Sequence, residues 1–166
     1  YDDGGVLQKS NPALLPERIR SVELAADFQV GQAGRFGVNF YHNDVQDLID
    51  QVLDPADGLL VFTNQSHVQT RGIDFNAERR WDGGYRVRGS LSRQWSSAAD
   101  GSELGNAPQW LGKLVFGLPL VAGWTAGAEW QGMSERRSLA GRVSGFGMVN
   151  VTLTSPNPNI GTFAAT

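Results

Sequence analysis

Residues 21–41 read SVELAADFQVGQAGRFGVNFY, and this stretch decides the fold. In its first half every second residue is apolar, and the apolar set is Val22, Leu24, Ala26, Phe28 and Val30. A period of two is typical of a β-strand with one apolar face. A turn with glycines at both ends, 31–34, leads into a second alternating run, in which Phe36, Val38 and Phe40 share a face. The sequence therefore predicts a β-hairpin.

The same alternation recurs along the chain. Further strands are expected in 70–81, 85–95, 113–118, 124–131 and 147–154, with a final partial strand at 160–166. The composition agrees, because 21 glycines and 7 prolines among 166 residues favour many strands and turns over helices. We expect one all-β unit: an antiparallel up-and-down meander of about eight long strands.

The connections between these strands alternate between short and long. Long polar loops are expected at 45–69, 96–109 and 132–145, and tight turns join the other strand ends. Transmembrane β-barrels segregate tight turns to one side and long loops to the other, and their strands are long enough to cross the bilayer. Aromatic residues near the strand ends would form interfacial girdles, as at Trp81, Tyr85, Trp110, Trp124 and Trp130. The meander is therefore predicted to be part of a transmembrane β-barrel.

Several classes of function find no support in the sequence. A net charge of -3 and the absence of a cationic run make nucleic acid an unexpected partner. The apolar run 114–124 is too short and too interrupted for a spanning helix. His42 and His67 lie on different segments without metal-ligand spacing, and no catalytic or nucleotide-binding motif is present. We therefore expect no enzyme activity, no catalytic residues, no metal site and no cofactor.

The segment NPALLPE, residues 11–17, precedes the first strand. Its prolines cannot donate to a strand ladder, so they are expected to keep the segment out of the sheet until Ser21. Glu17 and Arg18 are expected at the polar level where the strand enters the membrane. The motif resembles the Asn-Pro-x-Leu-x-Pro-Glu signature in the barrels of TonB-dependent outer-membrane receptors, with Leu15 at the usually basic position.

Other segments resemble that family in the same order along residues 10–155. YHNDVQDLI (41–49) resembles a family strand that ends in an acidic, apolar tip. QTRGIDFNAE (69–78) is similar to its Arg-Gly-x-Glu-x-Glu strand, with Asp74 for the usual Glu. NAPQWLGKLVF (106–116) and GRVSGFGMVNVTL (141–153) resemble two later family strands, the second with Ser144 and Phe146 in place of Pro and Tyr. Together these matches follow the order of the family strands over most of the chain.

The resemblance implies a role in TonB-dependent uptake of a ferric siderophore or similar large nutrient across the bacterial outer membrane. Residues 1–166 would be a single fragment, roughly a third of a barrel from near its C-terminal end, with the plug domain and remaining strands absent. Its implied partners are the rest of the barrel, the plug, outer-membrane lipid, TonB acting through the plug, and the iron chelate.

Candidate ligand-binding residues follow from position and charge. Arg86, Arg88 and Glu129 are expected on the lumen face, and Arg136 and Arg137 in a long loop. Their guanidinium groups could attract an anionic iron chelate. Inward-facing carboxylates, Asp74 and Glu78 among them, fit a hydrated lumen better than an acid/base pair.

One alternative remains open from the residues alone, a soluble lipocalin-like barrel whose apolar face surrounds a small hydrophobic ligand. The direction of the faces decides between the two. Seven apolar residues are diagnostic. If they face outward, the membrane barrel is favoured, and if they face inward, the soluble barrel is favoured. They are Phe36, Phe40, Phe75, Leu114, Phe116, Trp130 and Val151.

Overall fold

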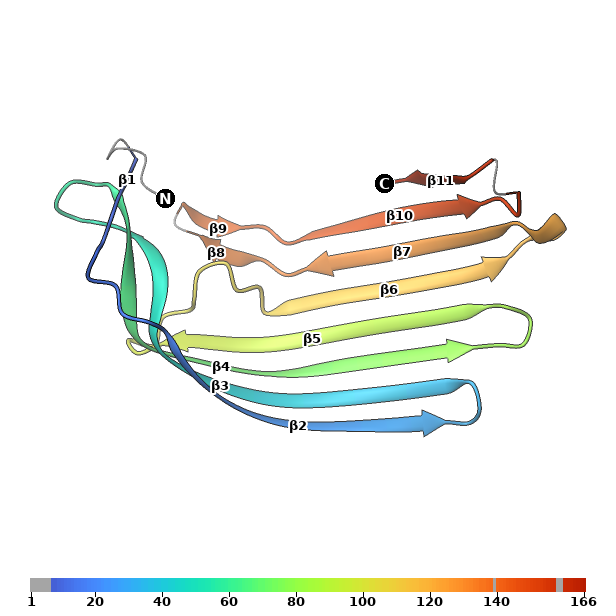
Figure 1. Ribbon diagram of the computed structural model, residues 1–166, viewed down its shortest axis with the longest axis horizontal. Helices are drawn as coiled ribbons and strands as arrows, with labels where there is room; N and C mark the ends of the chain where they lie inside the picture. The colour runs from blue at the N-terminus through green and yellow to red at the C-terminus, as the bar shows by residue number, and fades with distance from the viewer. Residues whose placement is uncertain (1–6, 139, 158–159) are drawn as a thin grey trace.

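The computed structural model describes residues 7–138, 140–157 and 160–166, without the side chains of residues 65 and 66. The described chain is an antiparallel sheet that follows chain order (Figure 1). Its strands are β2 (Arg18–Val30), β3 (Gly34–Leu53), β4 (Leu60–Arg80), β5 (Arg86–Ala98), β6 (Trp110–Pro119), β7 (Thr125–Met133), β10 (Phe146–Thr154) and β11 (Thr162–Ala165). This confirms the all-β up-and-down meander.

Four small elements accompany the sheet. β1 (Gln8–Lys9) pairs in parallel with β4, and β8 (Arg136–Ser138) forms a separate hairpin with β9 (Gly141–Val143) between β7 and β10. A single 3-10 turn, η1 (Val121–Gly123), joins β6 to β7. In the part of the chain described, no helix is long and apolar enough to cross a membrane.

The two ends of the sheet differ, as expected. Connections 31–33, 81–85, 120–124 and 155–161 lie at one end, and 54–59, 99–109 and 134–145 lie at the other, which carries the two longest connections and which we call the long-loop end (Figure 1). Within the described residues β2 and β11 occupy opposite edges of the sheet, so the barrel is not closed.

The predicted loop at 45–69 is wrong. β3 and β4 have 20 and 21 residues and continue as one hairpin through most of this stretch, with only 54–59 as the connection. The ladder between β2 and β3 ends at the pair Arg18 and Gln46, so seven residues of β3 project about 23 Å further at about 3.3 Å each. Beyond the membrane neither face of a strand has to be uniformly apolar, and the period-two pattern that would have predicted these strands is lost there.

Strand register separates the residues into two faces. Leu24 pairs with Phe40, which pairs with Ile73, and Phe116 pairs with Ala128, which pairs with Val151. All seven residues of the diagnostic set fall on this apolar face. The phenyl rings of Phe28, Phe36 and Phe75 stack along it with centroids 6.2 Å apart in each successive pair.

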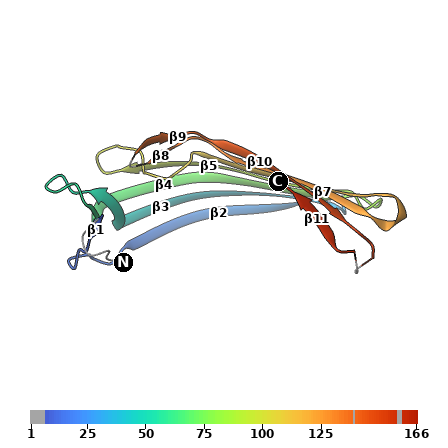
Figure 2. The same cartoon turned by 90° about the horizontal axis from the view of Figure 1, so that it is seen from above.

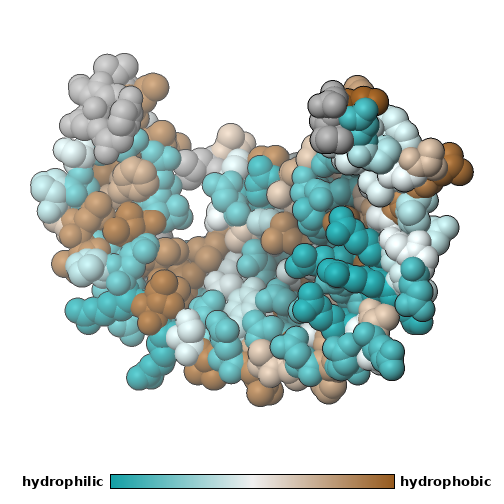
Figure 3. All heavy atoms as spheres, turned by 45° about the vertical axis from the view of Figure 1, so that its right-hand side comes forward, coloured by the Kyte–Doolittle hydropathy of each residue, from teal (hydrophilic) through white to brown (hydrophobic). Residues whose placement is uncertain are grey.

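The apolar face is exposed and the polar face is hollowed. Leu24 is 70% exposed and Val22 66%, and only Val45 and Val68 form a buried apolar pair among the described residues. A continuous apolar surface of this kind is not left facing water, so it is the lipid-facing side. The strands are bowed (Figure 2), and polar side chains gather in the hollow of the molecule (Figure 3). These directions contradict the soluble-barrel alternative.

Aromatic side chains mark both ends of the apolar belt. Trp81 and Tyr85 lie in the tight turn 81–85, and Trp95 and Trp110 lie at the long-loop end of β5 and β6. Trp130 lies flat across a row of glycines. A Cβ added to any of them would come within 3.3 Å of the indole, and they are Gly112, Gly132 and Gly147.

The segment 8–17, called the leader segment, crosses the projecting hairpin. The Asn11 amide donates to the Phe62 carbonyl, Leu15 exchanges two hydrogen bonds with the Asn64 side chain, and Glu17 accepts from the Ile49 N–H at 2.7 Å. Glu17 therefore satisfies a β3 donor just where the β2 ladder ends. β2 begins at Arg18, three residues before the predicted start.

The tip of the hairpin carries a three-charge contact. The Lys9 ammonium lies 2.5 Å from the Asp54 carboxylate and 2.7 Å from that of Asp57. This contact holds the pKa of both carboxyls below their ordinary value and raises the pKa of Lys9. It ties β1 to the 54–59 connection.

Candidate functional site

A groove of about 480 Å³ lies on the polar face of strands β3–β7. Among the described residues that line it, five are cations and two are carboxylates: Arg35, Arg80, Arg86, Arg88 and Lys113, with Glu78 and Glu129. The whole chain has a formal net charge of -3, so this cationic excess is a local property. A concave surface of one charge sign attracts ligands of the opposite sign.

The pairing of strands brings these side chains together. One cross-strand row runs Arg35, Glu78, Arg88, Val115 and Glu129 over five neighbouring strands. Because alternate residues of a strand point to opposite faces, the whole row faces the groove. The period-two pattern of the sequence assigns these residues to the polar face, and the register shows which of them are neighbours.

Glu78 is the centre of the row. Its carboxylate lies 3.0 Å from Arg35 Nη2 and 2.7 Å from Arg80 Nε, and its side chain is 12% exposed. Both carboxylate oxygens are used, one for each arginine, so Glu78 neutralises charge that would otherwise repel across the strands.

Arg86 and Arg88 differ from their neighbours because neither has an ion-pair partner among the described residues. Arg86 lies flat on the sheet over Gly117, where an added Cβ would be 2.8 Å from Arg86 Nε. The missing side chain at Gly117 leaves the room for the guanidinium. These two arginines supply uncompensated positive charge to the groove.

Glu129 is already paired. Its carboxylate lies 2.9 Å from Lys113 Nζ, and both side chains are partly exposed. The pair contributes little net charge to the groove.

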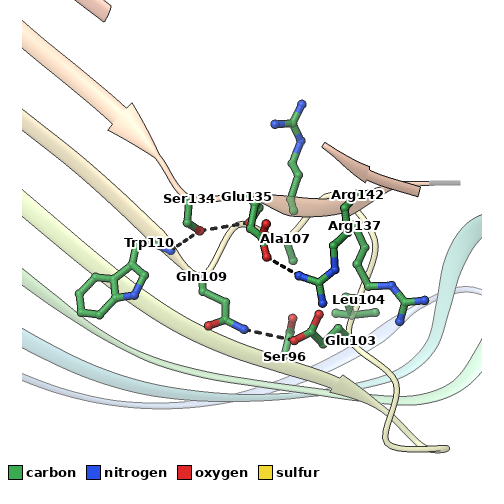
Figure 4. A pocket seen from close by; sticks show the side chains of 11 residues that line it. Ser96, Glu103, Leu104, Ala107, Gln109, Trp110, Ser134, Glu135, Arg137 and Arg142 are labelled. Carbon is green, nitrogen blue, oxygen red and sulfur yellow. Dashed lines mark hydrogen bonds and ion pairs between the residues drawn. The ribbon is translucent and has the colours of Figure 1, made fainter. Parts of the chain in front are cut away.

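Arg136 and Arg137 lie elsewhere, in the connection between β7 and β10. They line a pocket of about 120 Å³ formed with the loop 99–109 (Figure 4). The two loops are joined by the Asn106 N–H, which donates to the Arg137 carbonyl at 2.8 Å, and by two bonds between Ser134 and the Trp110 backbone. An ion pair between Arg142 and Glu135 closes one side.

The structure thus divides the five predicted ligand residues between two places. Arg86, Arg88 and Glu129 share the groove, whereas Arg136 and Arg137 belong to the loop pocket. Sequence reasoning missed Arg35 and Arg80, although the period-two pattern alone puts Arg35 on the polar face. Within the described ranges, no three metal-ligating side chains lie together.

An antiparallel sheet with a lipid-facing apolar side, a charged hollow side and loops segregated by length defines the wall of a transmembrane β-barrel. The chain belongs to the family described as TonB dependent receptor-like, beta-barrel, whose model matches residues 1–165. No curated protein matches it.

Two solved structures have a similar fold. A copper transporter, OprC, is 18% identical with a TM-score of 0.68, and the match covers 86% of this chain and 23% of that one. The FrpB iron transporter from Neisseria meningitidis (F3-3 variant) is 13% identical with a TM-score of 0.62, covering 90% and 26%. The chain therefore spans about a quarter of each transporter.

Proposed function

We propose that this chain is part of the barrel wall of a receptor in the bacterial outer membrane that imports a large nutrient with energy from TonB. The remaining strands and the plug domain of the receptor would complete the transport path. The family match and the lipid-facing apolar side support this role. The chain supplies wall, loops and part of the ligand surface, and has no enzymatic function.

The cargo that the groove suits best is an anionic metal chelate, such as a ferric siderophore. The observation that carries this proposal is the pair Arg86 and Arg88, which lie in a groove of cationic excess and form no ion pair with any described carboxylate. Guanidinium groups bind anionic oxygens through charge-assisted hydrogen bonds. The names of the two similar structures, copper and iron transporters, agree with a metal-containing cargo.

Binding and uptake of two iron chelates by the complete receptor test this proposal. One chelate is an anionic ferric tris-catecholate and the other a neutral ferric tris-hydroxamate. The double variant Arg86→Gln/Arg88→Gln should lower affinity for the anionic chelate about tenfold or more, since one charge-assisted hydrogen bond contributes about 1.5 kcal/mol or more. Arg18→Gln removes the same charge from an exposed site on the other face and is the matched control.

An unchanged affinity in the double variant would exclude these arginines from the ligand surface. If the receptor prefers the neutral chelate, the cargo class is wrong while the membrane role stands. If iron uptake by cells does not depend on the receptor and TonB at all, the transport role fails.

A further inference from the structure

A second cationic cluster lies on the apolar face, at its long-loop end. The pairs His42 with Arg71, Arg71 with Trp95, and Arg93 with Trp110 place these side chains on the same face as Phe40 and Ile73. They begin where the apolar belt ends. The groove on the polar face uses none of them.

The cluster surrounds a hollow of about 300 Å³. Its lining residues are His42, Gln69, Arg71, Trp95, Ser96 and Ser97. Gln69 and Ser97 are a cross-strand pair on the same face. The Gln69 side chain is hydrogen-bonded to the Asp44 carboxylate, so the Ser97 hydroxyl is the group available beside the Arg71 guanidinium. The hollow therefore combines a guanidinium with a hydroxyl donor.

Arg93 is held by two tryptophans, one of which, Trp95, lines this hollow. Its guanidinium carbon lies 4.5 Å from the Trp95 ring centroid and 4.6 Å from that of Trp110. The Arg93 Nε is buried without a hydrogen-bond partner. A cation between two aromatic rings is fixed in place and desolvated, yet its charge is not cancelled.

The cations of this cluster are not neutralised by nearby acids. Within the described residues neither Arg71 nor Arg93 takes part in an ion pair, and Arg71 is exposed. Asp44 lies on the same face beside His42, and its carboxylate is engaged by His67 at 2.9 Å and by the Gln69 side chain. The positive charge is therefore available to a ligand.

The level of the cluster in the membrane identifies that ligand. On β6 the apolar-face residues run from Trp110 to Leu118, nine residues or about 30 Å along the strand, which is about 23 Å of bilayer at a tilt of about 40°. The cluster thus lies at the headgroup level, with acyl chains beneath it against the next row of the apolar face, Val38, Phe75 and Leu91. Anionic headgroups attract basic side chains at this level.

We propose that Arg71, Arg93 and the hollow beside them bind the phosphate of a lipid headgroup in the leaflet on the long-loop side. The Arg71 guanidinium would donate to phosphate oxygens, and the Ser97 hydroxyl would complete the contact. Trp95 forms the wall, and the acyl chains extend down the apolar face. This inference rests on the membrane role proposed above and is independent of the cargo.

Lipid binding by the complete receptor, purified in a neutral detergent, tests the proposal. Diphosphoryl lipid A is the probe, and the same lipid with both phosphates removed is the comparison. Arg71→Gln and Arg93→Gln should each weaken binding of the phosphorylated lipid about fivefold, which corresponds to about 1 kcal/mol per arginine near a charged membrane surface. Arg88→Gln removes the same charge from the polar face and should leave lipid affinity unchanged.

Three results would overturn the proposal. These are equal binding of the two lipids, a loss of affinity as large in Arg88→Gln as in Arg71→Gln, and full displacement of the lipid by inorganic phosphate at equal concentration. Arg71 is exposed and makes no ion pair among the described side chains, so its variant keeps the experiment interpretable if Arg93→Gln unfolds. Normal lipid binding with failed chelate uptake would reject only the cargo.

Discussion

Exchanging Phe75 for arginine should destabilise the barrel strongly, whereas exchanging its neighbour Asn76 should not. Phe75 lies midway along the apolar belt of β4 and stacks on Phe36, with centroids 6.2 Å apart. An arginine on the lipid face costs about 2–4 kcal/mol at the bilayer midplane, and the lost aromatic pair adds about 0.5–1.5 kcal/mol. Asn76 lines the hydrated groove, where an arginine keeps its water. We therefore expect a difference of about 3–5 kcal/mol between Phe75→Arg and Asn76→Arg.

Reversible urea unfolding of the complete receptor in lipid vesicles measures this difference. Far-UV circular dichroism and the mobility of the unheated protein in SDS gels report the loss of the barrel. Phe75→Leu is the control for lost ring stacking without a charge. Equal destabilisation by Phe75→Arg and Asn76→Arg would refute the assignment of the two faces, and greater damage from Asn76→Arg would reverse it.

Two further predictions concern packing and pH. Gly132→Ala should cost about 1–3 kcal/mol, because the new Cβ would lie 2.9 Å from the Trp130 indole, and Gly127→Ala should be tolerated, since its nearest neighbour is 3.6 Å away; urea unfolding and near-UV circular dichroism compare them. The hairpin tip should loosen in acid. Because the carboxyl pKa of Asp54 is lowered, its ion pair with Lys9 is fully formed above the ordinary carboxyl pKa of 3.8 and is lost as the pH falls through the lowered pKa. The raised pKa of Lys9 keeps its ammonium group charged beyond pH 10.5. Amide exchange of 54–59, corrected for intrinsic rates, should therefore be constant at neutral pH and accelerate only in strong acid or base; acceleration near pH 6 would contradict this assignment.

The sequence predicted best where the membrane imposes a uniform rule. On β2 and β3 every second side chain faces lipid, so residues such as Leu24 and Phe40 could be assigned to one face without coordinates. The fold class, the order of strands and the two kinds of connection follow from that rule. The family motifs carried the same conclusion independently.

Prediction failed where lipid no longer constrains the chain. The projecting part of β3 and β4 has mixed faces, and its pairing depends on backbone hydrogen bonds that no side-chain pattern reports. The contacts of Asn11 and Glu17 with this hairpin are equally invisible, because they join residues more than thirty positions apart.

The candidate groove was predictable only in part. Arg86 and Arg88 follow from parity, but the pairing of Arg35 and Arg80 with the single carboxylate of Glu78 requires the register between β3, β4 and β5. Only the register shows which of the inward-facing charges form ion pairs within the described residues and which do not.

The unequal ends of the sheet also determine where this chain tolerates changes in length. A residue inserted in a tight turn such as 31–33 has to be absorbed by a longer turn or a bulge, because shifting the next strand by one position would turn its lipid-facing side chains into the lumen. The loop 99–109 is free of that constraint, since extra residues there extend into water and leave both neighbouring strands in register. Insertions and deletions among related barrels should therefore accumulate on the long-loop side, so that this rim diversifies while the opposite rim keeps a more constant length.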